Sequence, residues 1–260
     1  MDILTIVGLI GGFTAVVGGA MLEHLPISAI IQPTAFIIVM GGTMGAILVS
    51  YPIQDVKRAL SAGVKVCFQN INTDYRPLIE EISKVATVAR KEGVLAIEGL
   101  RGTIQDPHFK HALKFVIDGF EPKTVADILS TDAYLEMEEL EVAGKLVEGA
   151  GGYSPTIGII GAVLGLIHVM RNLDNPEAIG PGIAVAFVAT VYGVGFANLM
   201  FMPMGTKIKR KAGMIALRAE VIKLGIQGIQ EGLNPHFLKE KLEVFLDPKM
   251  RTPAEGGGGH

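Results

Sequence analysis

Residues 149–170 read GAGGYSPTIGIIGAVLGLIHVM, a run without any charged side chain when His168 is counted as neutral. A helix of about 20 apolar residues is long enough to cross the hydrocarbon core of a bilayer. Three other runs are equally free of charge, at 3–22, 24–54 and 178–206. We therefore predict four transmembrane helices, near residues 3–22, 29–51, 153–171 and 182–204.

The composition of the chain is also typical of a membrane protein. Of its 260 residues, 49% are hydrophobic and 33 are Gly, while none is Trp. Soluble domains of this length are usually less apolar. The net charge of −3 is too small to indicate a nucleic-acid partner. The single cysteine, Cys67, leaves no internal disulfide or thiol pair to expect.

A cleaved signal peptide is the alternative interpretation of the first apolar run. Its flank is Met-Asp without Lys or Arg, and no A-x-A site precedes a soluble domain, so a retained helix is the better prediction. The last five residues, GGGGH at 256–260, are typical of an appended tail and are left out of the predicted fold.

The basic residues predict the orientation of the chain in the membrane. Twelve of the 23 Lys and Arg lie in 57–145 and ten lie in 207–251, whereas the two short hairpins hold only Arg171. Cytoplasmic loops carry an excess of Lys and Arg. We therefore expect both long segments and both termini in the cytoplasm, with the short hairpins facing outward.

These observations predict an all-α, polytopic membrane protein with four transmembrane helices and a helical cytoplasmic domain. No strand signal is longer than a few residues. The predicted parts are a transmembrane hairpin at 1–54, a cytoplasmic helical domain at 55–150, a second transmembrane hairpin at 151–206 and cytoplasmic C-terminal helices at 207–255.

The predicted cytoplasmic domain contains a charged amphipathic segment. Apolar residues recur with a period near 3.6 over 77–100, which predicts one helix with Pro77 in its first turn. The opposite side carries Lys84, Lys91 and Glu98 at seven-residue steps. Further helices are predicted over the acidic stretch 133–148, over 212–231 and after the cap Asn234-Pro235.

The predicted spans contain no acidic residue. Carboxylates inside a membrane are costly and mark the paths of protons and cations, so an ion path here needs a carboxylate from a partner. The polar residues inside the spans are expected mainly to hydrogen-bond a carbonyl one turn back. They are Thr43, Ser154, Thr156, Thr190, Tyr192 and Asn198.

Enzyme and metal motifs are missing from the sequence. There is no G-x-S-x-G around Ser154, no C-x-x-C, no H-E-x-x-H and no phosphate-binding loop that ends in Gly-Lys-Ser/Thr. We therefore expect no catalytic residue, no metal ligand and no cofactor.

Several motifs together resemble one family, the A-subunits of bacterial flagellar stators of the MotA/PomA type. They are the third-span SPTIGIIGAVLGLI, the fourth-span AFVATVYGVGFANLMFMP with its basic exit, and ARKEGVLAIE in the insertion. The four spans and the large insertion after the second also match. The resemblance covers residues 1–250.

The resemblance implies a function and partners. In this family five A-subunits surround two copies of a single-span, peptidoglycan-anchored B-subunit, whose aspartate binds the coupling proton or sodium ion. Ion flow across the inner membrane turns the A-ring, which exerts torque on the switch complex of the flagellar rotor. The family's B-subunit would supply the carboxylate that the predicted spans lack.

The resemblance also assigns residues to two sites. Arg90 and Glu98 match the charges that contact the rotor, with Lys91 and Glu92 beside them. On one continuous helix, Lys91 and Glu98 would lie about 20° apart and Arg90 about 80° from Glu98.

The second group implied by the resemblance concerns the ion path and its coupling to motion. Pro155 and Pro203 match the coupling prolines, and Thr190 matches the threonine that faces the B-subunit aspartate. Thr156 and Ala162 would line the exit. Sodium-driven relatives commonly have a threonine in place of Ala162, which favours protons as the coupling ion.

Two alternatives remain open from the sequence. An energy-transducing subunit of the ExbB/TolQ type has a similar membrane core, but it usually has three spans. A non-conducting membrane scaffold would use the same polar groups only for packing.

Overall fold

The computed structural model describes residues 1–250, so the predicted tail at 256–260 lies outside the described residues. Every element in that range is helical, which confirms the all-α prediction. Within it, four stretches are long and apolar enough to span a membrane: Ile3–Leu22, Ile27–Ser50, and parts of Pro122–Arg171 and Ile179–Gln230. The four predicted spans coincide with these stretches.

The chain forms two compact units, which we describe separately. The membrane unit contains residues 1–70 and 139–211, and the helical unit contains, of the described residues, 71–138 and 212–250. Two long helices, α10 (Pro122–Arg171) and α12 (Met202–Gln230), contribute residues to both units. The units reflect which parts of the backbone lie close together, whereas the predicted limits at 54, 150 and 206 reflect the distribution of charge. Those limits remain predictions about the membrane boundary.

The membrane unit begins with α1 (Ile3–Leu22), which corresponds to the first predicted span. The second span is assembled from α2 (Ile27–Ile30), α3 (Pro33–Phe36), the π-helical η1 (Ile37–Gly41) and α4 (Gly42–Ser50). After Pro52 the chain continues through α5 (Ile53–Arg58), the π-helical η2 (Ala59–Gly63) and α6 (Val64–Phe68).

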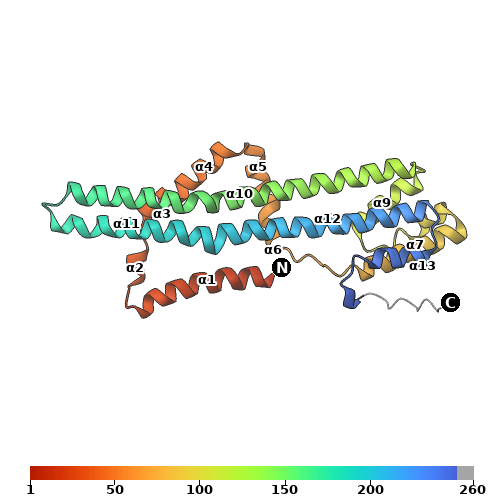
Figure 1. The fold of residues 1–260 in the computed structure, drawn as a ribbon, viewed down its shortest axis with the longest axis horizontal. Coiled ribbons are helices and arrows are strands. Elements are labelled where there is room, and N and C mark those ends of the chain that lie inside the picture. The colour runs from red at the N-terminus through yellow and green to blue at the C-terminus, as the bar shows by residue number, and fades with distance from the viewer. Residues whose placement is uncertain (251–260) are drawn as a thin grey trace, which may run out of the picture. The chain divides into compact units, whose positions relative to one another are not determined.

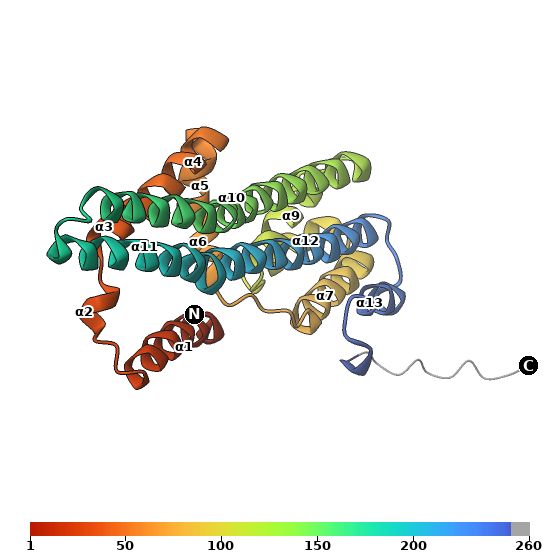
Figure 2. The same ribbon diagram turned by 60° about the vertical axis from the view of Figure 1, so that its left-hand side comes forward.

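The third and fourth spans form an antiparallel pair. Figures 1 and 2 both show α11 (Pro176–Phe196) running beside the second half of α10. A Cβ atom placed on Gly158 would lie 2.8 Å from the carbonyl oxygen of Ala189 and 3.1 Å from Cα of Gly193. These glycines therefore let the two backbones approach closely, as small residues do at helix contacts in membranes.

The fourth span continues beyond α11 without a break in the helix. The π-helical η4 (Ala197–Phe201) links α11 to α12, whose second residue is Pro203. Proline removes a backbone donor and crowds the carbonyl four residues earlier. A π-turn just before Pro203 is a local adjustment of the helix that accommodates it.

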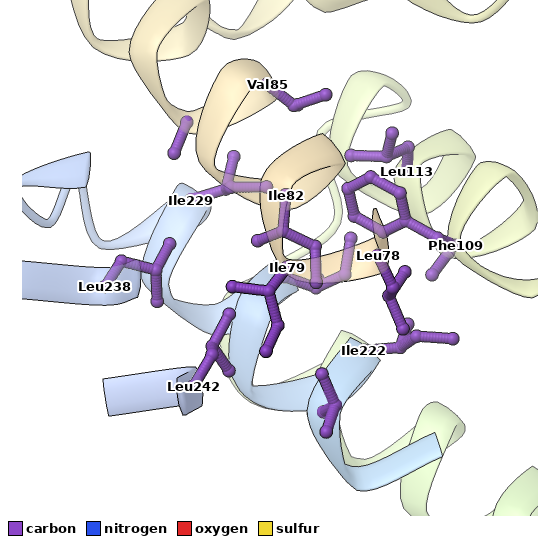
Figure 3. Close-up of a cluster of buried hydrophobic side chains, with 14 of the residues drawn as sticks. Leu78, Ile79, Ile82, Val85, Phe109, Leu113, Ile222, Ile229, Leu238 and Leu242 are labelled. Atoms are coloured by element: carbon purple, nitrogen blue, oxygen red, sulfur yellow. The ribbon is translucent and has the colours of Figure 1, made fainter. Parts of the chain in front are cut away.

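The helical unit has one apolar core, drawn in Figure 3. It is built from α7 (Arg76–Glu92), α9 (Pro107–Ile117), the end of α12 and α13 (Pro235–Glu243). The predicted cap of α13 is confirmed, because the Asn234 side chain accepts a hydrogen bond from the His236 N–H at 3.0 Å. The labelled core side chains are Leu78, Ile79, Ile82, Val85, Phe109, Leu113, Ile222, Ile229, Leu238 and Leu242.

The prediction of one helix over 77–100 is wrong at its C-terminal end. The helix α7 ends at Glu92, and Gly93 has φ 87° and ψ 163°, a conformation essentially restricted to glycine. The chain then forms the short 3-10 turn η3 (Val94–Ala96) and α8 (Ile97–Leu100). The apolar period continues through Gly93 because Ile97 and Leu100 still contact the core after the break.

Candidate functional site: a charged turn and a hydroxyl-bearing membrane face

The four residues that the resemblance assigns to the rotor contact lie within residues 90–98, a segment of the helical unit that we call the charged turn. Arg90, Lys91 and Glu92 form the last turn of α7, and Glu98 lies beyond Gly93 in α8. All four are exposed. The break at Gly93 corrects the angles expected from a continuous helix, because α8 does not continue the axis of α7. All four side chains are therefore exposed, but they do not lie on one face of a single helix.

The charges of this turn are unpaired within residues 1–250. None of the four side chains makes an ion pair there. Other charges of the same unit are paired: Arg218 Nε donates to Asp106 Oδ2 at 3.0 Å, and Lys223 Nζ lies 2.7 Å from Glu220 Oε2. The turn thus presents charges of both signs that remain available to a partner.

The residues assigned to the ion path lie on three consecutive helices of the membrane unit. Pro155, Thr156 and Ala162 belong to α10, Thr190 belongs to α11, and Pro203 belongs to α12. Pro155 and Ala162 are half-buried, whereas Thr156, Thr190 and Pro203 are exposed.

Close contacts bring three of these residues to one level of the α10–α11 pair. A Cβ atom on Gly193 would lie 3.2 Å from Cα of Pro155. Gly193 is less than one helical turn beyond Thr190, and Ala189, which precedes Thr190, contacts Gly158. Pro155, Thr156 and Thr190 therefore sit near the same depth of the membrane unit.

Pro203 approaches the same region from α12. A Cβ atom on Gly151, one turn before Pro155, would lie 3.3 Å from the backbone nitrogen of Met202. The two prolines therefore lie near one another at the same end of the α10–α11 pair, whereas Ala162 lies about two turns further along α10.

Three of the six polar residues predicted inside the spans bond to their own helix, as the sequence predicts. The hydroxyl of Thr156 donates to the Tyr153 carbonyl at 2.8 Å, and that of Thr190 donates to the Ala186 carbonyl at 3.2 Å. The Asn198 amide donates to the Val194 carbonyl at 2.9 Å. Both threonines are exposed in the part of the chain that the structure describes, so their hydroxyls remain accessible to a partner.

Three polar residues of the spans depart from that expectation. Tyr192 donates its hydroxyl to the Ile30 carbonyl at 2.7 Å, which joins the second span to the fourth. Thr43 and Ser154 are buried, and their hydroxyl oxygens have no hydrogen-bond partner within the described residues.

A polar cluster at the start of α1 is a feature that the sequence patterns did not indicate. Lys207 Nζ and Lys211 Nζ each lie 2.8 Å from Asp2 Oδ2. Lys211 is only 5% exposed, and it also donates to the backbone carbonyls of Val66, Cys67 and Gln69. We call Asp2, Lys207 and Lys211 the N-terminal clamp.

The clamp fixes the start of the first span. The Asp2 N–H donates to the Phe68 carbonyl at 2.7 Å, and the Asp2 carboxylate accepts from the Thr5 N–H at 3.3 Å. Hydrogen bonds from Lys207 and then from Lys211 hold the pKa of Asp2 far below its ordinary value. Nothing local in the sequence pairs Asp2 with residues at the other end of the chain.

Two family models match the chain. The model described as Motility protein A N-terminal matches residues 6–93, and that of the MotA/TolQ/ExbB proton channel family matches residues 101–221. Together they cover the first two spans almost completely, Arg90, Lys91 and Glu92 at the end of α7, and the α10–α11 pair, whereas Glu98 lies between the two matched ranges.

Individual proteins support the same relationship. Motility protein A of Bacillus subtilis is 32% identical over 96% of this chain and 93% of its own length. Motility protein A of Helicobacter pylori is 34% identical over 95% of this chain and 96% of its own. A solved structure of C. jejuni MotAB matches with a TM-score of 0.86 at 32% identity, covering 96% of this chain and 99% of that one. The chain therefore belongs to the motility protein A group of the MotA/TolQ/ExbB proton channel family.

Proposed function

We propose that this protein is the A-subunit of an ion-driven flagellar stator, which couples ion flow across the inner membrane to torque on the rotor. The observation that carries the proposal is the exposed face of α10 and α11. Two hydroxyls, from Thr156 and Thr190, lie there among exposed apolar side chains such as Ile160 and Phe187. This face offers two hydroxyl oxygens but no charge, so an ion that passes along it needs a carboxylate from a separate chain.

The partner that completes this path is a B-subunit with one span and an aspartate. A charged group inside a bilayer costs about 2.5–3.5 kcal/mol on insertion scales, so it needs a polar lining. We assign that lining to Thr156 and Thr190, with Ala162 nearby on α10. The solved relative is a MotAB assembly, which supports this partner. Two B-subunits within five A-subunits is the stoichiometry that we adopt from the family.

The coupling ion in this proposal is the proton. A methyl group at Ala162 offers no oxygen to a sodium ion, which prefers several oxygen ligands. Pro155 and Pro203 border the path near one end of the α10–α11 pair, where a bend of the backbone is least restrained by the helix hydrogen bonds. We assign these prolines to the coupling between ion passage and helix movement.

The proposed topology places both termini, the charged turn and the helical unit in the cytoplasm. The N-terminal clamp supports this arrangement, because it gathers two lysines beside the start of the first span, where the positive-inside rule expects them. The charged turn is then available to the rotor switch complex, while lipid covers the remaining apolar faces. The proposal gives the chain no catalytic residue, cofactor or nucleic-acid partner.

The ExbB/TolQ type fits less well than the stator type. The Motility protein A N-terminal model matches residues 6–93, which include nearly all of the first two spans and the end of α7 with Arg90, Lys91 and Glu92. The described residues also contain four candidate spans, where the ExbB/TolQ type usually has three.

The test uses cells that lack their own A-subunit and produce this chain with its B-subunit. We expect swimming that depends on the proton gradient, is stopped by a protonophore and is independent of external sodium at fixed pH. Thr190→Ala and Pro155→Leu should abolish rotation while leaving the assembly with the B-subunit intact. Thr14→Ala is the matched control, since Thr14 is an exposed threonine on α1.

The outcomes separate the candidate functions. Sodium-dependent swimming would reject the proton as the coupling ion but keep the stator. Full rotation by both Thr190→Ala and Pro155→Leu would reject the proposed path. Failure of this chain to associate with the B-subunit would instead favour the non-conducting scaffold.

A further inference from the structure

Leu95 is a large apolar side chain held in solvent at the centre of the charged turn. It is 75% exposed, more than any other large apolar side chain of the helical unit within the described residues, where Val244 follows at 63%. Exposed apolar residues in the membrane unit can be covered by lipid. The helical unit contains no predicted span, so lipid does not account for Leu95.

The backbone on both sides of Leu95 is fixed by contacts with the core. Ile97 is fully buried, and Val94 and Leu100 pack against the same core cluster. The Ala96 N–H donates to the Gly93 carbonyl at 3.2 Å, which closes the turn. Because its neighbours point inward, Leu95 is directed outward from a preformed turn, and its binding would restrict little more than its own side chain.

The surroundings of Leu95 have the organisation of a protein interface. Binding sites commonly place an apolar anchor at the centre and a polar, charged rim around it. Here the rim consists of Arg90, Lys91, Glu92 and Glu98, none of which forms an ion pair within residues 1–250. Unpaired charges of both signs complement a partner surface that also carries both signs.

We propose that Leu95 is the apolar anchor of the rotor contact and inserts into an apolar recess between charged side chains of the switch-complex protein. This inference rests on the proposed stator function and adds a residue and a contact type to it. Exposed ion pairs are weak and are screened by salt. Burial of one leucine supplies an attraction that salt does not screen, while the charged rim selects the orientation.

The test compares three variants in motile cells that contain the whole stator and rotor. Leu95→Ser removes the apolar surface, and Leu95→Met keeps its approximate volume. Leu135→Ser is the matched control, since Leu135 is an exposed leucine of the same unit. The measurements are the torque per stator and the time that each stator stays engaged, both from stepwise speed changes of a tethered bead.

We expect Leu95→Ser to shorten the engagement time about tenfold, the change in affinity that corresponds to losing the burial of a leucine side chain. Leu95→Met and Leu135→Ser should both stay near the parent value. A photoreactive residue at position 95 should crosslink to the switch-complex protein. That adduct should disappear in cells without the switch ring.

Each result bears on the proposal. Parent-like engagement by Leu95→Ser, combined with loss of torque by Arg90→Glu, would reject the anchor and keep the stator function. If Leu95→Ser fails to assemble, the crosslinking experiment at position 95 tests the proposal instead. Absence of a crosslink to the switch-complex protein would then reject Leu95 as the anchor. Parent-like torque in Arg90→Glu and Thr190→Ala alike would instead reject the proposed function itself.

Discussion

Lys211 Nζ lies 2.8 Å from Asp2 Oδ2, and this contact joins the first residues of the chain to α12, just beyond the predicted fourth span. Lys211 also donates hydrogen bonds to the Val66 and Cys67 carbonyls at the C-terminal end of α6, where the helix dipole favours a cation. The first span has little other support, since Thr5 is its only buried residue. We infer that the N-terminal clamp holds this span against the rest of the membrane unit.

Removal of one clamp partner should destabilise the protein strongly. Lys211→Met leaves the Asp2 carboxylate with one cation and removes a hydrogen bond from each of the Val66, Cys67 and Gln69 carbonyls, for which we expect a loss of about 3–5 kcal/mol. The measurement is thermal unfolding of the detergent-solubilised protein. Lys209→Met is the control: its ion pair with Glu148 is more exposed and should contribute about 0–1 kcal/mol. Equal losses in both variants would contradict the role of the clamp.

The clamp should be insensitive to pH across the neutral range. The pKa of Asp2 is lowered by Lys207 and Lys211, so its stabilising contribution is complete above the unfolded value of about 3.9 and is lost as pH falls toward the lower folded value. We expect the difference in melting temperature between the parent and Asp2→Asn to be constant from pH 5 to 8 and to shrink only in stronger acid. A difference that changes near pH 6 or 7 would point to another titrating group.

The contact between α10 and α11 should not tolerate a larger residue. Gly158→Val places atoms against the Ala189 carbonyl, 2.8 Å from the new Cβ, and overpacking of this kind typically costs about 1–3 kcal/mol. We expect reduced yield of folded protein and a lower melting temperature. Gly152→Val serves as the comparison in the same helix, because a Cβ there meets nothing within 4 Å. Comparable behaviour of the two variants would argue against close packing.

The break in the charged turn should depend on glycine. Gly93 has φ 87° and ψ 163°, so Gly93→Ala should cost about 1–3 kcal/mol even though a Cβ meets nothing within 4 Å. We expect lower torque per stator, because the turn that carries Glu98 and Leu95 would shift. Gly99→Ala is the control, as Gly99 is helical and also has open space around it. Normal stability of Gly93→Ala would show that the turn adapts.

The spans could be predicted because charge is expelled from a bilayer, and uncharged runs such as 149–170 leave few other structures possible. The end of α7 could not be predicted, because apolar periodicity indicates which residues are buried and not where a helix ends. Ile97 remains buried after the break, so the pattern continues. The sequence placed Arg90 and Glu98 in an exposed segment but gave them the wrong common axis. It gave no sign of the clamp, since Asp2 and Lys211 meet only through the tertiary fold.

The glycine contacts between α10 and α11 have a mechanical consequence. The backbones of α10 and α11 contact each other directly at Gly158 and Gly193, without side chains between them. We therefore expect the two helices to move together as one rigid body. We expect bending of the fourth span to occur where the helical winding is irregular, at Ala197–Phe201 directly before Pro203.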